Sequence, residues 1–166
     1  MCNFLKLTSC LKKDEMKILI ISILVILNFG ALYLGALLMG GSPASNSWYI
    51  HLNKAPWTPP GAVFGLAWTT IMLCLTWFFS LITGHSEIKP LVVLYGVQLI
   101  FNVLWNPLFF NWHLPVLALV VIILLFVVVL GMFILTRGEP KSYLILPYLI
   151  WLVIAISLNA YVVVMN

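Results

Sequence analysis

The amino-acid sequence predicts an all-α membrane protein, folded as a bundle of five transmembrane helices. Of its 166 residues, 64% are hydrophobic and 7% are charged, whereas a soluble domain is about 25% charged. A soluble fold of this size would not cover so much apolar surface with so few charges. Five uncharged apolar stretches of at least 20 residues each recur along the chain, joined by mostly short connections.

Each of these stretches is long enough to cross a bilayer, which takes about 20 apolar residues in a helix. β-Branched residues are frequent, for example over residues 120–129, but a lipid-embedded span has to be a helix or a closed barrel. The stretches lack the alternation of a barrel strand, so helices are favoured. We predict spans over residues 18–39, 62–82, 91–110, 114–135 and 143–165.

The connections predict the arrangement of these spans. Three of the four are short and force neighbouring helices to run antiparallel, so we expect one domain over residues 18–166, preceded by a basic segment over residues 1–17. The connection over residues 40–61 is longer and holds four prolines. Because proline fixes the backbone, this segment is expected to be either a semi-rigid lid or a stiff connection.

The distribution of Lys and Arg predicts the orientation. Seven of the eight basic residues fall in the N-terminal segment and in the two connections on the same side, whereas Lys54 alone lies on the other side. The positive-inside rule then places the N-terminus in the cytoplasm and the C-terminus outside, for insertion into a bacterial inner membrane. A basic end next to an apolar span is a topology signal, so we expect a lipid bilayer as partner and no nucleic acid.

Several kinds of chemistry have no support in the sequence. No ionisable residue lies deep within a span, which argues against charge-coupled transport. His51, His85 and His113 lie in connections without metal-ligand spacing, so no metal site is expected. A single histidine can hold haem, which keeps His51 as an open alternative. No serine has a nearby base, and no catalytic group is assigned.

Polar and aromatic side chains share one face of the third span. Tyr95, Gln98, Asn102 and Trp105 fall within about 80° of one another at 100° per residue. An amide that faces lipid is costly, so this face is expected to meet protein or a cavity.

Two further spans present similar faces. Trp151, Ala155 and Asn159 follow one another at intervals of four in the fifth span, with Tyr148 one turn earlier, and the second span carries Trp68. For each residue alone, helix packing and a ligand pocket are equally open. Together, the three faces favour a pocket for a flat, hydrophobic, partly polar ligand.

These residues occur in motifs that resemble those of the TspO/MBR family, also called translocator proteins, tryptophan-rich sensory proteins or peripheral-type benzodiazepine receptors. The match runs from Trp48 to Asn159 in the family's order and spacing, and it resembles a bacterial-type member. The matching motifs are Trp48-Tyr49, Lys54, Trp57-Thr-Pro-Pro60, Trp68-Thr69, Tyr95-Gly-Val-Gln98, Asn102, Trp105-Asn-Pro-Leu-Phe-Phe110, Pro147-Tyr-Leu-Ile-Trp151 and Leu158-Asn159.

The resemblance implies a homodimeric receptor or sensor that binds porphyrin-type tetrapyrroles, including protoporphyrin and haem, and requires no cofactor. The pocket would be closed by the first long loop. Two alternatives are light- and oxygen-dependent porphyrin degradation, with Trp68 and Trp151 as the photochemical residues, and facilitated transport of an apolar metabolite. The ligand-binding residues implied are Trp57, Trp68, Gln98, Asn102, Trp105, Trp151, Ala155 and Asn159.

The chain departs from the family pattern at two informative places. Gly61-Ala62 stands where an aromatic residue commonly follows the two prolines, which removes one ring from the expected lid. No basic residue follows Tyr161, whereas animal members carry one in a sterol motif that is itself weak evidence. This absence favours a bacterial-type member over a sterol carrier.

Overall fold

The computed structural model describes the backbone of residues 2–166 and the side chains from residue 14 onward, and it confirms the predicted five-helix membrane fold. The described chain contains helices and turns but no strand. The predicted basic segment 1–17, with Lys6, Lys12 and Lys13, lies mostly outside the described side chains. The long helices are α1 (Cys2–Leu38), α3 (Gly61–Leu81), α4 (Ile88–Asn106), α5 (Pro115–Leu135) and α6 (Leu146–Met165).

The helices that are long and apolar enough to cross a membrane follow the predicted spans closely. Large apolar side chains remain on the outer surface, such as Leu66 on α3 and Ile26 on α1, both 70% exposed. So much exposed apolar surface is expected where lipid rather than water surrounds the bundle. The spans are Asp14–Leu38, Gly61–Leu81, Ile88–Asn111, Pro115–Leu135 and Pro140–Met165.

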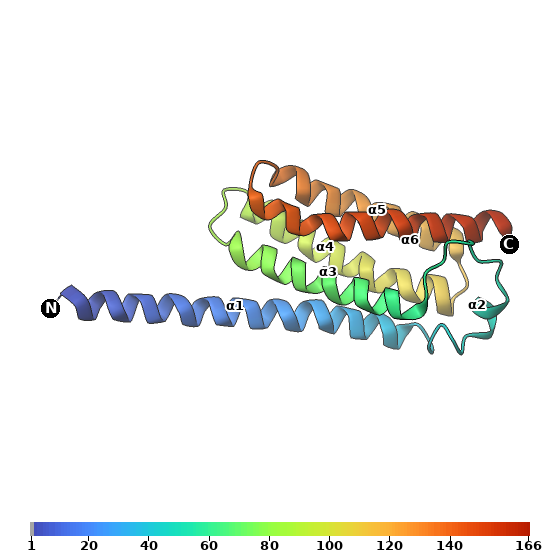
Figure 1. Cartoon of the computed structure of the whole chain (residues 1–166), viewed down its shortest axis with the longest axis horizontal. Helices are drawn as coiled ribbons and strands as arrows, with labels where there is room; N and C mark the ends of the chain where they lie inside the picture. Colours follow the sequence, from blue (N-terminus) through green and yellow to red (C-terminus); the bar gives the residue numbers. More distant parts are fainter. Residues whose placement is uncertain (1) are drawn as a thin grey trace.

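The helices run antiparallel to their neighbours in sequence, as the short connections predict (Figure 1). Helix α4 packs against both α1 and α5, α5 packs against α6, and α1 lies beside α3. The N-terminal part of α1 extends beyond the other helices, and the C-terminus lies at the opposite end of the molecule, next to α2 (Figure 1). Helix α2 (Ser47–His51) and the long connection that contains it therefore sit over the C-terminal end of α6.

We predicted a single regular helix for the third span, but the structure divides it into two parts. Helix α4 ends at Asn106 and continues as the π-turn η1 (Pro107–Asn111). Proline has no N–H and its ring crowds the preceding turn, so the backbone widens here. The Trp112 N–H then donates to the Pro107 carbonyl at 2.8 Å, five residues back. The wide turn buries Phe109 and Phe110 on the side of the bundle below the long loop.

The long connection contains a short helix, α2, that we did not predict from the sequence. The Asn46 side chain accepts a hydrogen bond from the Tyr49 N–H at 3.0 Å, which caps the N-terminus of α2. Its amide also donates to the Phe110 carbonyl at 2.8 Å. One asparagine therefore both starts α2 and fastens it to η1.

Helix α1 lies against α4 at Gly35, where a larger residue would displace the Asn106 side chain. A Cβ at this position would lie 2.7 Å from Asn106 Nδ2, which is closer than real Cβ contacts. The small residue allows the two helix backbones to approach, as is common in membrane bundles.

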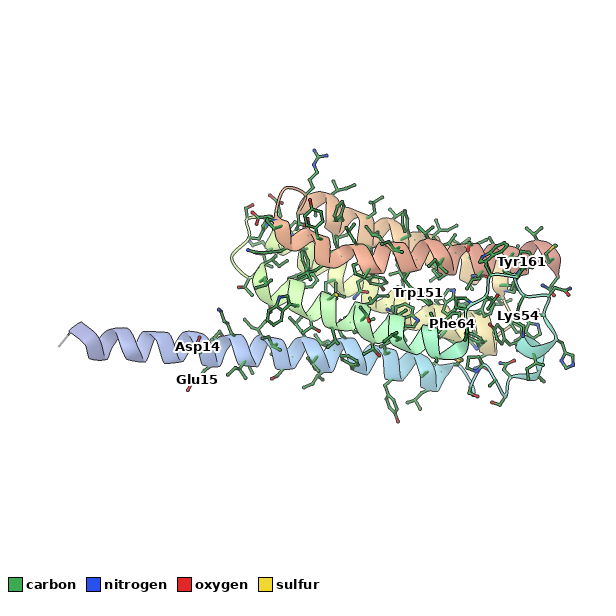
Figure 2. The ribbon with its side chains drawn as sticks, viewed as in Figure 1. Asp14, Glu15, Lys54, Phe64, Trp151 and Tyr161 are labelled. Atoms are coloured by element: carbon green, nitrogen blue, oxygen red, sulfur yellow. The ribbon has the colours of Figure 1, made fainter. Side chains whose placement is uncertain are left out.

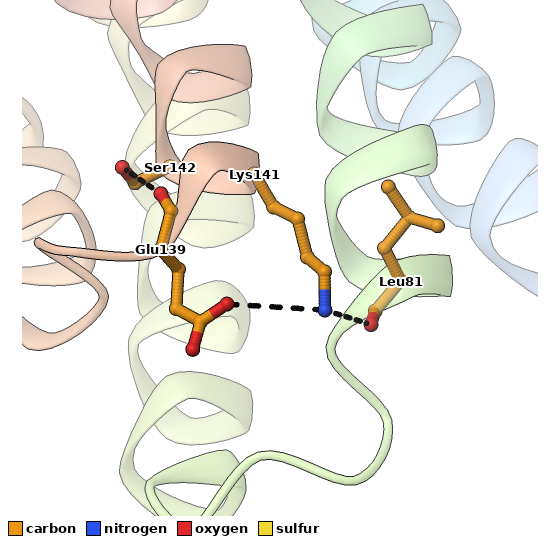
Figure 3. A network of polar contacts seen from close by, with 4 residues as sticks. All are labelled: Leu81, Glu139, Lys141 and Ser142. Carbon is orange, nitrogen blue, oxygen red and sulfur yellow. Dashed lines mark hydrogen bonds and ion pairs between the residues drawn. The ribbon is translucent and has the colours of Figure 1, made fainter.

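At the other end of the bundle, a polar network joins the fifth span to α3 (Figure 3). Lys141 Nζ donates to the Leu81 carbonyl at 3.3 Å and lies 4.0 Å from a carboxylate oxygen of Glu139. Ser142 Oγ donates to the Glu139 carbonyl at 2.7 Å within η2 (Pro140–Ile145). The cation thus sits at the C-terminus of α3, where the helix dipole favours positive charge.

Candidate functional site

Two adjoining cavities lie beneath the long loop, at the end of the bundle where α6 ends. The inner cavity has a volume of about 50 Å³ and the outer one about 500 Å³. The outer cavity is walled by the loop itself, from Ser42 to Gly61, and by Met39 at the end of α1. The residues that line both cavities are Tyr49, Lys54, Thr58, Phe64, Trp105 and Phe110.

Aromatic rings form the wall between the cavities and the bundle. Trp105 of α4 stacks on Phe109, with ring centroids 5.4 Å apart, and meets Phe110 edge-on at 5.7 Å. Tyr49 of α2 packs edge-on against Phe110 at 5.2 Å. Because these rings hold one another, the wall is shaped before any ligand arrives.

The loop carries the one cation that lines the cavities. Lys54 Nζ lies 4.7 Å from the centroid of the Tyr49 ring and donates to the Ile50 carbonyl at 3.4 Å. Burial raises the pKa of the Tyr49 phenol above its ordinary value. The phenol therefore stays neutral at physiological pH, and the ammonium is the charged group at this site.

The loop is tied to the end of α6 by polar and ring contacts. The Asn53 N–H donates to Asn166 Oδ1 at 2.9 Å, and Asn166 Nδ2 donates back to the Asn53 carbonyl at 3.3 Å. Trp57 Nε1 donates to Ser157 Oγ at 3.2 Å, and the Trp57 ring meets Tyr161 edge-on at 5.4 Å. Figure 2 shows Lys54 and Tyr161 at this same end of the molecule.

Of the residues predicted to bind a ligand, Trp105, Ala155 and Asn159 line the cavities. Trp105 lines both, whereas Ala155 and Asn159 line the inner cavity. Asn159 also has a packing role, because its amide bridges the first turn of α5. In the orientation that satisfies both amide atoms, its nitrogen donates to the Pro115 carbonyl at 3.1 Å and its oxygen accepts from the Leu119 N–H at 3.0 Å.

The predicted amides Gln98 and Asn102 lie in the bundle interior instead, where they meet on Tyr148. Asn102 Nδ2 donates to the Tyr148 hydroxyl at 3.0 Å, and that hydroxyl donates to Gln98 Oε1 at 3.0 Å. Gln98 is fully buried, and its Nε2 has no hydrogen-bond partner among the described residues. A buried donor without a partner is rare in proteins and costs stability.

The remaining predicted tryptophans do not line either cavity. Trp68 packs edge-on against Tyr148 at 5.9 Å. Trp151 packs edge-on against Phe64 at 5.2 Å, and Figure 2 shows these two side chains next to each other. Since Phe64 lines both cavities, Trp151 lies one ring behind the cavity wall. Trp57 fastens the loop, as described above.

A second buried polar cluster was not predicted. Asn28 of α1 is fully buried; its Nδ2 donates to Thr76 Oγ1 at 2.9 Å and its Oδ1 accepts from the Tyr95 hydroxyl at 2.9 Å. Asn28 is an amide within an uncharged span, and its transfer to lipid is as unfavourable as that of Gln98. This cost could have indicated from the sequence that Asn28 faces protein. Phe64 carried no such signal, because a phenylalanine in an apolar helix also suits packing or lipid.

Comparison with known proteins identifies the family. Residues 22–165 match the model of the TspO/MBR family. The chain is 33% identical to a tryptophan-rich sensory protein from Cereibacter sphaeroides over 138 residues, which cover 78% of this chain and 87% of the relative. It is 31% identical to a tryptophan-rich protein TspO from Archaeoglobus fulgidus over 151 residues, 89% and 96% of the two chains.

An animal relative matches over a smaller share of both chains. The chain is 33% identical to a translocator protein from Bos taurus over 124 residues, 68% of this chain and 70% of the relative. The family match covers all five spans except the start of the first, and the helices are those of a multi-pass membrane protein. The chain therefore belongs to the TspO/MBR family and is an integral membrane protein.

Proposed function

We propose that this protein is a membrane receptor or sensor that binds porphyrin-type tetrapyrroles, such as protoporphyrin and haem, beneath its long loop. The observation that carries the proposal is the pair of adjoining, aromatic-walled cavities at the loop end of the bundle. The outer cavity, at about 500 Å³, falls within the range of about 300–1,000 Å³ that is usual for small-molecule sites.

The chemistry of the walls suits a flat, conjugated ligand. Tyr49, Phe64, Trp105 and Phe110 offer ring faces and edges against which a macrocycle can stack. The inner cavity, at about 50 Å³, has room for one or two waters rather than a ring. A bound macrocycle therefore occupies the outer cavity, with Ala155 and Asn159 below it.

The photochemical alternative receives less support. Electron donation to an excited porphyrin by Trp68 or Trp151 is most direct when the indole touches the ligand. In this conformation neither indole lines either of the two cavities beneath the loop, and Phe64 lies between Trp151 and these cavities. Equal bleaching of illuminated protoporphyrin by the parent and by Trp151→Phe would leave the receptor as the function.

The names of the relatives agree with a receptor. The Cereibacter relative is called a sensory protein and the bovine relative a translocator protein. Neither name specifies a ligand, so the tetrapyrrole rests on the cavities and on the resemblance of the motifs.

The proposal is tested by titrating protoporphyrin in the dark and following tryptophan fluorescence in lipid nanodiscs. We expect saturable quenching, with an affinity that Trp105→Leu weakens by roughly twofold to tenfold, because a stacked aromatic contact contributes about 0.5–1.5 kcal/mol. Trp77→Leu is the matched control, since Trp77 lies on α3, is 56% exposed and lines neither cavity. Non-saturable quenching that is equal in the parent and Trp105→Leu would refute the proposal.

A further inference from the structure

We propose that Lys54 makes the cavities selective for ligands that carry a carboxylate, so that an anionic macrocycle binds more tightly than its neutral ester. The inference rests on the proposed function, because it concerns the same cavities and the same class of ligand. It adds a charge requirement and assigns that requirement to one side chain of the loop.

The position of Lys54 is the first support. Its side chain lines both cavities, and it is exposed at the loop end of the molecule (Figure 2). The Tyr49 ring at 4.7 Å and the Ile50 carbonyl at 3.4 Å hold the ammonium near the aromatic wall. A ligand stacked on that wall would place a short acidic substituent within reach of the ammonium.

The second support is the distribution of acidic groups. The whole sequence has four acidic side chains. Asp14 and Glu15 lie on α1 far from Lys54 (Figure 2), and Glu87 and Glu139 lie in the turns at the end of the bundle opposite the loop. Among the described residues, Lys54 makes no ion pair. No acidic side chain therefore lies beside Lys54, and its charge is available to a ligand.

The third support is physical. The Lys54 ammonium donates one hydrogen bond to the Ile50 carbonyl and lies against one ring face, so it keeps further donor capacity, since Lys has three N–H donors. A carboxylate is an ionised acceptor for this ammonium, and the bond between them is charge-assisted. Because Lys54 is exposed, water and salt weaken the attraction. We therefore expect a preference of roughly threefold to tenfold rather than an absolute requirement.

Lys54 also has a possible purely structural role, as a strut between Ile50 and the Tyr49 ring. The two roles are separable by substitution. Lys54→Gln keeps a hydrogen-bond donor but removes the charge, whereas Lys54→Arg keeps the charge and the ring contact. Lys89→Gln removes one exposed charge at the opposite end of the bundle and serves as the matched control.

The experiment compares protoporphyrin, a dicarboxylic acid, with its dimethyl ester. Both are titrated in the dark into the full-length protein in nanodiscs of zwitterionic lipid, and the signal of empty nanodiscs is subtracted. The parent is expected to bind the acid roughly threefold to tenfold more tightly than the ester. The preference should disappear in Lys54→Gln and persist in Lys54→Arg and Lys89→Gln.

Each other outcome has a distinct meaning. Equal affinity of the parent for the acid and the ester overturns the inference and leaves the proposed function intact. A preference that survives in Lys54→Gln also overturns it, because the carboxylate is then recognised elsewhere. If neither compound binds saturably to the parent, the proposed function itself fails, and the inference fails with it.

Discussion

Two buried polar clusters cross the bundle, and they differ in whether their hydrogen bonds are complete. The closed cluster consists of Asn28, Thr76 and Tyr95, and both ends of the Asn28 amide are bonded within it. The open cluster consists of Gln98, Asn102 and Tyr148, and it leaves Gln98 Nε2 without a partner. Both clusters use α4, and their residues are at most 7% exposed.

Both clusters use amide and hydroxyl groups, but only the closed cluster satisfies all the hydrogen bonds of its amide. The closed cluster joins α1, α3 and α4 and satisfies the polar groups that it buries, which is what packing alone requires. The open cluster joins α4 and α6 but retains an unpaired donor in an apolar interior, at a cost to stability. Packing alone does not require such an exception.

The largest effect is expected from breaking the closed cluster with Asn28→Leu. The substitution leaves the Thr76 and Tyr95 hydroxyls unpaired and should lower the free energy of unfolding by about 2 kcal/mol. Thermal unfolding in detergent measures the loss. Thr76→Val removes one bond and should cost less, and protoporphyrin affinity should be retained in both. An unchanged unfolding temperature in Asn28→Leu would contradict the assignment.

A smaller effect is expected from Tyr148→Phe, which removes the hydroxyl that joins the open cluster. Two interhelical hydrogen bonds are lost, and at about 0.6 kcal/mol for each such bond in a membrane we expect a loss of about 1 kcal/mol. Protoporphyrin affinity should be retained, because neither amide lines the cavities. Tyr143→Phe is the matched control, because Tyr143 is 67% exposed and outside the cluster. Equal effects of the two substitutions would remove the special status of Tyr148.

The smallest effect on stability is expected from Gln98→Leu. The lost bond to Tyr148 is offset by removal of the unpaired Nε2, so the free energy of unfolding should stay within about 0.5 kcal/mol of the parent. Ligand affinity should also stay near that of the parent, because Gln98 lines neither of the cavities in which the ligand is proposed to bind. Unfolding and protoporphyrin titration on the same samples test this. A destabilisation as large as that of Asn28→Leu would show that the bond from Tyr148 outweighs the cost of the unpaired donor.

The helices were predictable because the bilayer thickness sets their minimum length and because charged residues are costly inside the bilayer. Uncharged runs gave their number, and the short turns gave their directions. The π-turn at Pro107 was missed because a proline changes the hydrogen bonding of the helix backbone but leaves the hydropathy of the apolar stretch unchanged. Helix α2 was missed because a five-residue helix depends on one cap, Asn46, whose role becomes visible only beside Phe110.

The site was predictable only in part, for a physical reason. Spacing along one helix identifies residues that share a face, as with Gln98, Asn102 and Trp105, but not which of them meets a cavity. That depends on neighbouring helices: Tyr148 fills the space beside the two amides, whereas the end of η1 leaves space beside Trp105. Phenylalanines of the cavity wall, such as Phe64, are as apolar as residues that face lipid, so the sequence alone does not distinguish them.

The ties between the loop and α6 bear on the rates of exchange through the cavities. The loop is anchored at Asn46, at Asn53 and at Trp57, so only short stretches between these points are free to move. The chain entropy of a long connection is therefore already lost on folding, and a guest does not have to order the loop around itself. For the proposed ligand, we expect passage beneath the loop to require the exposed bonds at Asn53 and Trp57 to break, so that this local opening contributes to the residence time.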